Sequence, residues 1–410
     1  VPTEDEAEAD IILFNTCCIR DNAEKRAKGN IGAIKKYKKL NPNLLVVVMG
    51  CMTQQDKLGE ELRKSFPFID IVLGTNNIDK LGSLVTEYKS SRKPIVAIDK
   101  NDNPLINEDV PIYRTSGTNA WINIMYGCNN FCTYCIVPYV RGRERSRNPK
   151  DIIDEFKSML DAGYKEITLL GQNVNSYGND LGMKDGFTKL LEQIADISGE
   201  HRIRFMTSHP KDFSPSLIDV IAASPNICNN IHLPIQSGSD KILQLMNRHY
   251  TRSDYMKIID NIRAKIPDCG ITSDIMVGFP YEEEEDFLQT LEVVNEVKYS
   301  GAFTFVYSMR KGTPAASMPQ ISPEVAKDRI MRLVEMQNKI TKQVSKTYEG
   351  KTYRVLCEDV APKGNGFVCG RTDCGRMVTF EGDTSCIGKF FDVAIERSQS
   401  ASLFGKVRDK

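Results

Sequence analysis

The sequence lacks the features that would place a protein in a membrane or outside the cell. No apolar run in its 410 residues reaches the roughly 18 residues that a membrane-spanning helix needs. No signal-peptide pattern is seen, and 12 cysteines are too sparse for a disulfide scaffold. We therefore expect a cytoplasmic protein with reduced thiols and no membrane partner.

An excess of charge of one sign is also missing. The chain has 54 lysines and arginines against 54 aspartates and glutamates, so bulk charge does not indicate a nucleic-acid binder. Its length allows two or three domains, each with its own core. The chain opens on Val1 and an acidic stretch, so we expect the N-terminus to be incomplete.

What the sequence does have is a loop with three closely spaced cysteines, Cys128, Cys132 and Cys135. In a four-iron cluster each iron is usually bound by one thiolate ligand. Three thiolates therefore leave one iron open to hold and activate a small molecule. Zinc is the alternative, but structural zinc sites more often show paired knuckles, and no second knuckle follows here. The spacing therefore favours an iron–sulfur cluster.

The segment 1–90 is expected to form a small parallel α/β domain. Continuous apolar runs, typical of strands buried on both faces, alternate with charged helical segments. The expected strands are 11–15, 44–49 and 70–73, and the expected helices are 21–40 and 54–66. Residues 91–118 contain several proline, asparagine and aspartate residues and are expected to be a polar connector.

The segment 119–346 repeats a strand-then-helix pattern that fits a partial, open (β/α)6 barrel with a long exit helix. The cysteine loop follows its first strand, at the end of such barrels where active sites lie. The expected strands are 121–125, 166–170, 203–207, 230–233, 272–277 and 303–307. The segment 347–410 has short alternating runs broken by glycines, at 353–358, 366–371, 377–381 and 390–396, and is expected to be an all-β barrel.

Two further cysteines, Cys17 and Cys51, each lie at the end of an expected N-terminal strand. A single buried strand-end cysteine is most often a small hydrophobic residue. At equivalent ends of neighbouring strands, however, two thiols can converge on one site, which would need a third ligand. Cys18 is expected to point to the opposite face of the strand and is not assigned as that ligand.

These motifs together resemble the radical S-adenosylmethionine (SAM) methylthiotransferases. The stretches that carry the resemblance are 15–20, 50–52, 126–138, 170–175, 204–210, 232–239 and 278–280. Within that family, 170–175 and 207–210 are similar to the branch that acts on tRNA, and the terminal barrel resembles a TRAM RNA-binding domain. The resemblance implies that Cys128, Cys132 and Cys135 hold a [4Fe-4S] cluster whose open iron chelates SAM, which is reductively cleaved to a 5′-deoxyadenosyl radical.

The resemblance also implies a second [4Fe-4S] cluster, with Cys17 and Cys51 as two of its three cysteine ligands. The family's first cysteine has no match here, and we expect it to lie on a missing N-terminal strand. The implied reaction inserts a methylthio group at carbon 2 of N6-isopentenyladenosine at position 37 of tRNA, with SAM as methyl donor and radical source. The implied partners are an isopentenylated anticodon stem-loop and an electron donor such as flavodoxin or ferredoxin.

Candidate contacts to SAM and RNA follow from the same resemblance. SAM contacts are expected from Tyr134, Gly171, Gln172, Asn173, Ser208, Gln236, Ser237 and Asp274. Ordinary polar chemistry at strand ends is the alternative. Phosphate contacts are expected from Arg141, Arg143, Arg145 and Arg147, with a solvated basic loop as the alternative.

Two other functions stay open at this point. A sister methylthiotransferase would act on threonylcarbamoyl-adenosine of tRNA or on an aspartate of a ribosomal protein, and segment 170–175 argues against both. A non-catalytic zinc or iron–sulfur RNA-binding module is the second alternative. Iron content and colour after anaerobic purification separate that module from a radical SAM enzyme.

Overall fold

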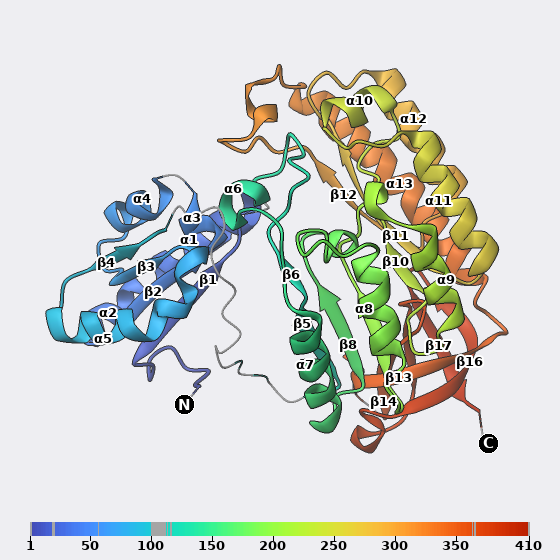
Figure 1. The fold of residues 1–410 in the computed structure, drawn as a ribbon, viewed down its shortest axis with the longest axis horizontal. Helices are drawn as coiled ribbons and strands as arrows, with labels where there is room; N and C mark the ends of the chain where they lie inside the picture. Colours follow the sequence, from blue (N-terminus) through green and yellow to red (C-terminus); the bar gives the residue numbers. More distant parts are fainter. Residues whose placement is uncertain are drawn as a thin grey trace. The chain divides into compact units, whose positions relative to one another are not determined.

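The computed structural model describes residues 2–18, 21–55, 57–99, 112, 114, 117–362, 364 and 366–408. These residues form two compact units (Figure 1). The first unit lies within Val1–Ile112, Tyr126–Glu144 and Ser308–Ala316, and the second within Tyr113–Met125, Arg145–Tyr307 and Ser317–Lys410. Across the described parts of the chain, no helix has the length and apolarity to cross a membrane.

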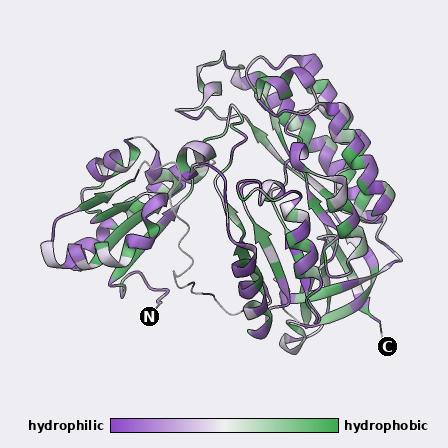
Figure 2. Ribbon diagram, in the orientation of Figure 1, coloured by the Kyte–Doolittle hydropathy of each residue, from purple (hydrophilic) through white to green (hydrophobic). Residues whose placement is uncertain are grey.

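A four-stranded parallel sheet, in the order β1-β2-β3-β4, forms the centre of the first unit. The strands are β1 (Ile11–Thr16), β2 (Leu45–Gly50), β3 (Ile71–Leu73) and β4 (Ile95–Ala97). Every residue of β2 is buried, as its continuous apolar run predicts for a central strand (green in Figure 2). The helices are α1 (Asp21–Ala33), α2 (Lys35–Leu40), α3 (Cys51–Gln54), α4 (Leu58–Ser65), α5 (Leu81–Ser91) and, after the cysteine loop, α6 (Val137–Arg141), with a 3-10 turn η1 (Thr75–Lys80).

The fourth strand is a finding that the sequence pattern missed. β4 lies inside segment 91–118, which was expected to be a polar connector, and it pairs with β3 from Ile71↔Ile95 to Leu73↔Ala97. Most of the remaining connector lies outside the described residues, as does Arg20 of the N-terminal motif. The expected helix over 21–40 is present as two helices, α1 and α2.

The second unit contains the six parallel strands of the expected partial barrel, in sequence order. They form two three-stranded groups, β5-β8-β9 and β10-β11-β12, flanked by helices (Figure 1). The strands are β5 (Asn119–Asn123), β8 (Glu166–Leu170), β9 (Arg202–Phe205), β10 (Asn230–His232), β11 (Gly270–Val277) and β12 (Gly301–Val306), with short strands β6 (Met125–Tyr126) and β7 (Arg145–Ser146). The helices are α7 (Pro149–Asp161), α8 (Gly186–Ala195), α9 (Pro215–Ala223), α10 (Asp240–Leu245), α11 (Arg252–Lys265), α12 (Glu284–Val297) and α13 (Pro323–Lys346).

Local sequence signals explain where two of these helices start. The side chain of Asn148 accepts a hydrogen bond from the Lys150 amide, and Pro149 occupies the first turn of α7. α12 begins at a capping box between Glu283 and Asp286.

The chain ends in a closed five-stranded barrel, in the order β13-β14-β15-β17-β16. Its strands are β13 (Thr352–Val360), β14 (Phe367–Thr372), β15 (Met377–Glu381), β16 (Phe390–Gln399) and β17 (Ser402–Val407). Closure leaves no free sheet edge, and Val355, Val368 and Phe380 fill the interior. The fifth strand, β17, was not expected from the sequence.

A buried arginine fixes the terminal barrel to strand β9. Arg202 is 2% exposed, and its guanidinium donates to the backbone oxygens of Arg371 and Arg354, each at 2.6 Å. Its Nε also lies 2.6 Å from a carboxylate oxygen of Asp373. The charge of Arg202 is thus matched by three acceptors, all on the terminal barrel.

We expect Arg202→Ala to lower the stability of the second unit strongly. The substitution removes two hydrogen bonds from a charged donor to backbone carbonyls, each contributing about 1.5–3 kcal/mol, whereas the ion pair with the exposed Asp373 carboxylate contributes about 1 kcal/mol or less. Thermal unfolding followed by circular dichroism measures the effect. The matched control is Arg354→Ala, because the ion pair of Arg354 with Glu200 is exposed on both sides and contributes about 1 kcal/mol or less. Equal melting temperatures for the two variants would contradict the prediction.

Candidate functional site

The loop with the three cysteines directly precedes α6 in the first unit. Cys128 and Cys132 are buried and Cys135 is partly exposed. Gly127 permits the loop geometry, because its φ is +75° and a Cβ there would lie 1.9 Å from the backbone oxygen of Arg143. A side chain at position 127 would therefore displace the returning segment.

Backbone hydrogen bonds fix this loop on both sides. The amide of Cys128 donates to the Gly142 oxygen at 3.2 Å, and the amide of Cys135 donates to the Cys132 oxygen at 2.9 Å. Asn129 and Glu144 close the loop reciprocally. The Asn129 amide donates to Glu144 Oε1 at 3.1 Å, and the Glu144 amide donates to Asn129 Oδ1 at 3.3 Å.

The loop is also attached to the rest of the first unit. Ile136 and Val140 belong to the apolar cluster that contains Ile31 and Met52. The hydroxyl of Thr75 donates to the Val140 oxygen at 2.6 Å. The helix after the cysteine loop is therefore part of the N-terminal core.

The sulfur atoms themselves are not assembled into a metal site. As they stand, no three cysteine, histidine, aspartate or glutamate side chains in the described ranges lie close enough together to hold a metal ion. The donor set still fits an iron–sulfur cluster, because Cys128, Cys132 and Cys135 supply three thiols from one loop of fixed backbone, and cysteine thiolate is the usual ligand of such clusters. Tyr134, next to Cys135, is half-buried.

The strand register brings the second cysteine pair to equivalent positions. Thr16 pairs with Gly50 at the ends of β1 and β2, and Cys17 and Cys51 are the first residues after these strands. Gly50 has a φ of +106°, and a Cβ there would lie 2.4 Å from the Thr16 oxygen. Cys17 is exposed, whereas Cys51 is buried.

Cys18 lies closer to Cys51 than the sequence pattern implied. Cys18 is 1% exposed and Cys51 is 3% exposed, and their thiols are hydrogen-bonded. This hydrogen bond, more than burial, raises the pKa of Cys18. The same bond lowers the pKa of Cys51 to about 6, helped by the nearby Arg141 charge against the opposing effect of burial. Within the pair, Cys51 is therefore the thiol that ionises more readily, and thiolate is the form that binds metals.

The four arginines after the cysteine loop have different environments. Arg141 donates from Nε to the sulfur of Cys51 at 3.2 Å. Arg143 is exposed, with its guanidinium 4.5 Å from the centre of the Phe131 ring. Arg145 is half-buried on β7.

Arg147 is structural in this fold. It is 7% exposed, and Nη1 donates to Glu155 Oε2 and to the Asn123 oxygen, both at 2.7 Å. Because these contacts occupy Arg147 inside the second unit, we do not retain it as a phosphate contact.

Unsatisfied polar atoms gather at the carboxyl ends of β8 and β9 in the second unit. Buried polar atoms normally have partners, so a group without them indicates a ligand-binding position. Among the described residues, the atoms without a hydrogen-bond partner here are Gln172 Oε1, Asn173 Oδ1, Asn175 Nδ2, Ser208 Oγ and His209 Nε2. Gln172, Asn173 and Ser208 were predicted from the sequence as SAM contacts, whereas Asn175 and His209 were not.

His209 is held neutral in this cluster. Burial, aided by the charge of Arg248, lowers the pKa of His209 far below its usual range. Its Nδ1 accepts a hydrogen bond from the Lys211 amide at 3.2 Å. A neutral ring that accepts at Nδ1 carries its proton on Nε2, so His209 offers a buried donor.

Backbone strain marks the same strand ends. Thr207, just after β9, has a φ of +68°, and Gln236, after β10, has a φ of +69°. A positive φ is costly for a residue other than glycine, and most costly for a β-branched one, so such residues cluster at ligand sites. A Cβ on Gly171 would lie 2.7 Å from Met125 Cγ, so position 171 also needs its glycine.

The last two predicted SAM contacts, Asp274 and Ser237, differ in their burial and in their hydrogen-bond partners. Asp274 is partly exposed at β11, with Oδ2 3.7 Å from His232 Nε2. Ser237 is wholly buried, and its Oγ lies 3.4 Å from the hydroxyl of Thr290 and accepts from the Ser239 amide at 3.2 Å. Ser237 therefore has partners within the protein, and we do not retain it as a SAM contact.

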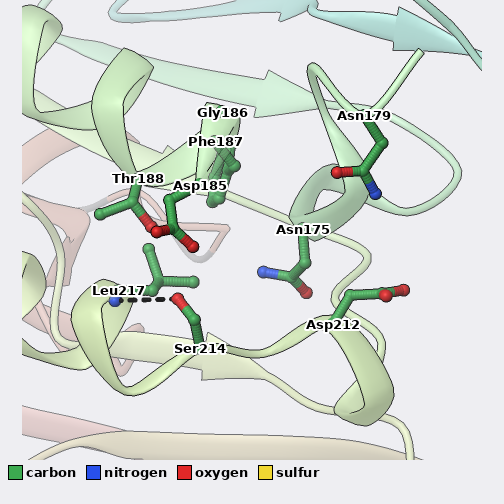
Figure 3. A pocket seen from close by; sticks show the side chains of 9 residues that line it. All are labelled: Asn175, Asn179, Asp185, Gly186, Phe187, Thr188, Asp212, Ser214 and Leu217. Carbon is green, nitrogen blue, oxygen red and sulfur yellow. Dashed lines mark hydrogen bonds between the residues drawn. The ribbon is translucent and has the colours of Figure 1, made fainter. Parts of the chain in front are cut away.

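A small polar cavity of about 130 Å³ opens beside these strand ends (Figure 3). Ser214 on its wall caps α9 by accepting from the Leu217 amide at 3.2 Å. Cofactor pockets span about 300–1,000 Å³, so this cavity is too small for SAM. Its remaining lining residues are Asn175, Asn179, Asp185, Gly186, Phe187, Thr188 and Asp212.

Three family models match successive parts of the chain. The radical SAM superfamily matches residues 122–294, and the TRAM domain matches residues 346–407. A family described as uncharacterized protein family UPF0004 matches residues 1–74.

The chain is similar along almost its whole length to proteins named tRNA-2-methylthio-N(6)-dimethylallyladenosine synthase. The protein of Clostridium botulinum (strain Okra / Type B1) is 49% identical over 407 residues, which are 99% of this chain and 90% of the relative. The protein of Clostridium tetani is 50% identical over 404 residues, covering 98% and 89% of the two chains. That of Desulforamulus reducens is 46% identical over 406 residues, covering 99% and 89%.

Solved structures agree on the fold. The radical SAM methyltransferase TsrM from Kitasatospora setae, with tryptophan and a SAM analogue bound, has a TM-score of 0.57 at 15% identity. The match covers 76% of this chain and 65% of that chain. The same enzyme with cobalamin and a [4Fe-4S] cluster bound has the same TM-score at 16% identity. At such identity the likeness shows the radical SAM fold alone.

Proposed function

The chain belongs to the radical SAM methylthiotransferase family, and we propose that it inserts a methylthio group at carbon 2 of N6-isopentenyladenosine at position 37 of tRNA. The observation that carries this proposal is the identity of 46% to 50% to tRNA-2-methylthio-N(6)-dimethylallyladenosine synthases along nearly the whole chain. The family uses SAM and [4Fe-4S] clusters. When bound, these cofactors supply the one-electron chemistry and the methyl group.

In this proposal, Cys128, Cys132 and Cys135 hold the cluster that binds SAM. The fixed loop backbone carries the three thiols, and three protein ligands on a four-iron cluster leave one position for SAM. Loss of any one thiol would leave two positions without protein ligands. All three residues are therefore expected to be needed.

The strand ends of β8 to β11 are proposed to bind SAM itself. SAM carries an ammonium, a carboxylate, hydroxyls and an adenine, and these groups would satisfy the buried atoms of Gln172, Asn173 and Ser208 that lack partners in the described structure. Gln236 lies at a strained backbone position there, and Asp274 offers a partly exposed carboxylate. Gly171 allows close packing at this edge. Tyr134 is retained as a candidate contact from the cysteine loop.

The second cluster is proposed to use Cys17 and Cys51. Their positions after the register-paired residues Thr16 and Gly50 bring two strand ends to the same edge of the sheet. The lowered pKa of Cys51, about 6, favours the thiolate that iron binds. Cys17 is exposed, so a cluster that it held would be accessible to a substrate.

The tRNA partner follows from the family and from the TRAM match. A base in an anticodon loop has to be splayed out to enter a barrel, and loops are recognised by shape, stacking and phosphate contacts. Because the substrate is tRNA, we expect the enzyme to act in the cytoplasm. A flavodoxin or ferredoxin is the proposed electron donor.

Nucleoside analysis tests the proposed function. The full-length enzyme is expressed in a bacterial strain that lacks 2-methylthio modification, and the tRNA nucleosides are separated by liquid chromatography with mass detection. We expect 2-methylthio-N6-isopentenyladenosine to appear. Methylthiolation of threonylcarbamoyl-adenosine instead would assign the chain to the sister activity.

We expect replacement of Arg143 and Arg145 by alanine to weaken tRNA binding and reduce its salt dependence. Each lost phosphate contact lowers the log–log salt slope by about one, so the double variant loses up to about two. Arg143 is the more exposed of the pair. SAM cleavage without RNA should be unchanged.

Lys150→Ala provides the matched control for this measurement. Lys150 is exposed, and its charge is paired with Asp154 at 2.6 Å one helical turn away. Its removal should leave the salt slope as in the unmodified enzyme. An unchanged slope in the double arginine variant would make the basic segment an ordinary solvated loop.

A further inference from the structure

A side chain from the cysteine loop region reaches the second cysteine site. Arg141 is the last residue of α6, six positions after Cys135, and its Nε lies 3.2 Å from the sulfur of Cys51. Ninety residues separate Arg141 from Cys51 in the sequence. The segment that carries the SAM-cluster ligands thus contributes a donor to a ligand of the other cluster.

The backbone around Arg141 is held in place. Val140 is buried in the N-terminal apolar cluster, and its oxygen accepts from the Thr75 hydroxyl at 2.6 Å. On the other side, the Gly142 amide donates to the Pro138 oxygen at 3.1 Å, and Gly142 has a φ of +74°. Arg141 is therefore presented to Cys51 by fixed structure on both sides.

A second arginine, Arg310, lies near enough to Cys18 for its charge to act on that thiol. The charge of Arg310 acts on Cys18, the hydrogen-bond partner of Cys51. Its Nη2 is buried and has no hydrogen-bond partner among the described residues. The segment of Arg310 is attached to the cysteine loop, because the Ala315 amide donates to the Thr133 oxygen at 2.9 Å. Two arginines therefore act on the Cys18–Cys51 pair, Arg141 by direct contact with Cys51 and Arg310 more weakly through Cys18.

We propose that Arg141 is a positioning residue of the N-terminal cluster, donating a charged hydrogen bond to the Cys51 sulfur when that sulfur is an iron ligand. This inference rests on the proposed function. Hydrogen bonds to ligand sulfurs and local charge set the reduction potential of an iron–sulfur cluster. A guanidinium stabilises the more negative, reduced state more than the oxidised state, so Arg141 raises the potential.

The sulfur contact accounts for Arg141 better than a phosphate contact does. Arg141 is half-buried with its Nε directed to sulfur, whereas Arg143, two residues later, is exposed and stacked on Phe131. A phosphate would have to displace the Cys51 contact. The two arginines therefore have different roles. Arg141 contacts the N-terminal cluster site, whereas Arg143 is exposed to solvent.

The test uses the full-length chain with Cys128, Cys132 and Cys135 all replaced by alanine, which leaves the N-terminal cluster as the one to be measured. Arg141→Gln, Arg141→Lys and Arg143→Gln are each added to this parent. After anaerobic reconstitution, iron and sulfide are quantified, and the midpoint potential is measured by reductive titration followed by electron paramagnetic resonance.

We expect about four irons per chain in the parent and a more negative midpoint potential in Arg141→Gln. Arg141→Lys keeps the charge but loses the planar donor, so its shift should be smaller. Arg143→Gln removes the same charge from an exposed site of the same segment and should leave the potential unchanged. Loss of iron from Arg141→Gln alone, with Arg143→Gln fully loaded, also supports the inference.

Two results would overturn the inference by itself. One is a parent-like potential in Arg141→Gln with full iron content. The other is an equal shift in Arg143→Gln, which would assign the effect to bulk charge. Absence of iron from the parent is a different failure, because it would remove the proposed N-terminal cluster and this inference together.

Discussion

Replacing Cys128, Cys132 or Cys135 by alanine is expected to abolish the cleavage of SAM to 5′-deoxyadenosine. Three thiolates bind the cluster and leave one iron open for SAM. A variant with two thiolates can neither hold the cluster in place nor present a single open iron. The effect should be total, unlike the partial losses expected for residues that contact SAM. Anaerobic assay of 5′-deoxyadenosine with a chemical reductant measures it.

Two controls make this result specific. Cys369→Ala removes a half-buried thiol from the terminal barrel, remote in sequence from the loop, and should cleave SAM normally. The loop variants should also keep the N-terminal cluster, seen as about half of the iron. Normal 5′-deoxyadenosine production by any of the three loop variants would refute the assignment of these cysteines.

Most of the fold was predictable because its strands have strong local signals. The continuous apolar run of β2 and the capping residues of α7 and α12 each specify their element without distant contacts. β4 was missed because its three residues, which directly follow a proline, carry too little pattern, and pairing with β3 decides their structure. β17 was missed because its two-residue turn, with Ser400 at a φ of +52°, has neither glycine nor proline to mark it.

The parts of the candidate site that depend on a short stretch of sequence were predictable. The roles of residues that depend on a contact with a distant part of the chain were not. The cysteine spacing is a local signal, so the loop was recognised from sequence. Arg141 and Arg147 look alike in the sequence, yet Arg141 contacts Cys51 and Arg147 is buried against Glu155. No local pattern distinguishes them, because each role is set by a partner from another part of the fold.

The two cysteine sites can be separated by substitution, and the expected result distinguishes their chemistry. Cys17→Ala or Cys51→Ala should leave SAM cleavage to 5′-deoxyadenosine intact and stop the formation of the methylthio nucleoside. The reason is that each cluster has its own protein ligands, so loss of a ligand from one leaves the other coordinated. Iron content should fall by about half in both variants.

Cys18→Ala is the decisive control. The Cys18 thiol is hydrogen-bonded to Cys51, but Cys17, not Cys18, is the first residue after strand β1. The buried thiol of Cys18 belongs to the N-terminal apolar cluster, and its hydrogen bond to Cys51 is the largest cause of the lowered Cys51 pKa. Removing the Cys18 thiol leaves Cys17 and Cys51 in place to hold the cluster. Cys18→Ala is therefore expected to keep its iron and to modify tRNA. If Cys18→Ala is inactive while Cys17→Ala modifies tRNA fully, the ligand beside Cys51 is Cys18, and the buried thiol rather than the exposed one binds iron.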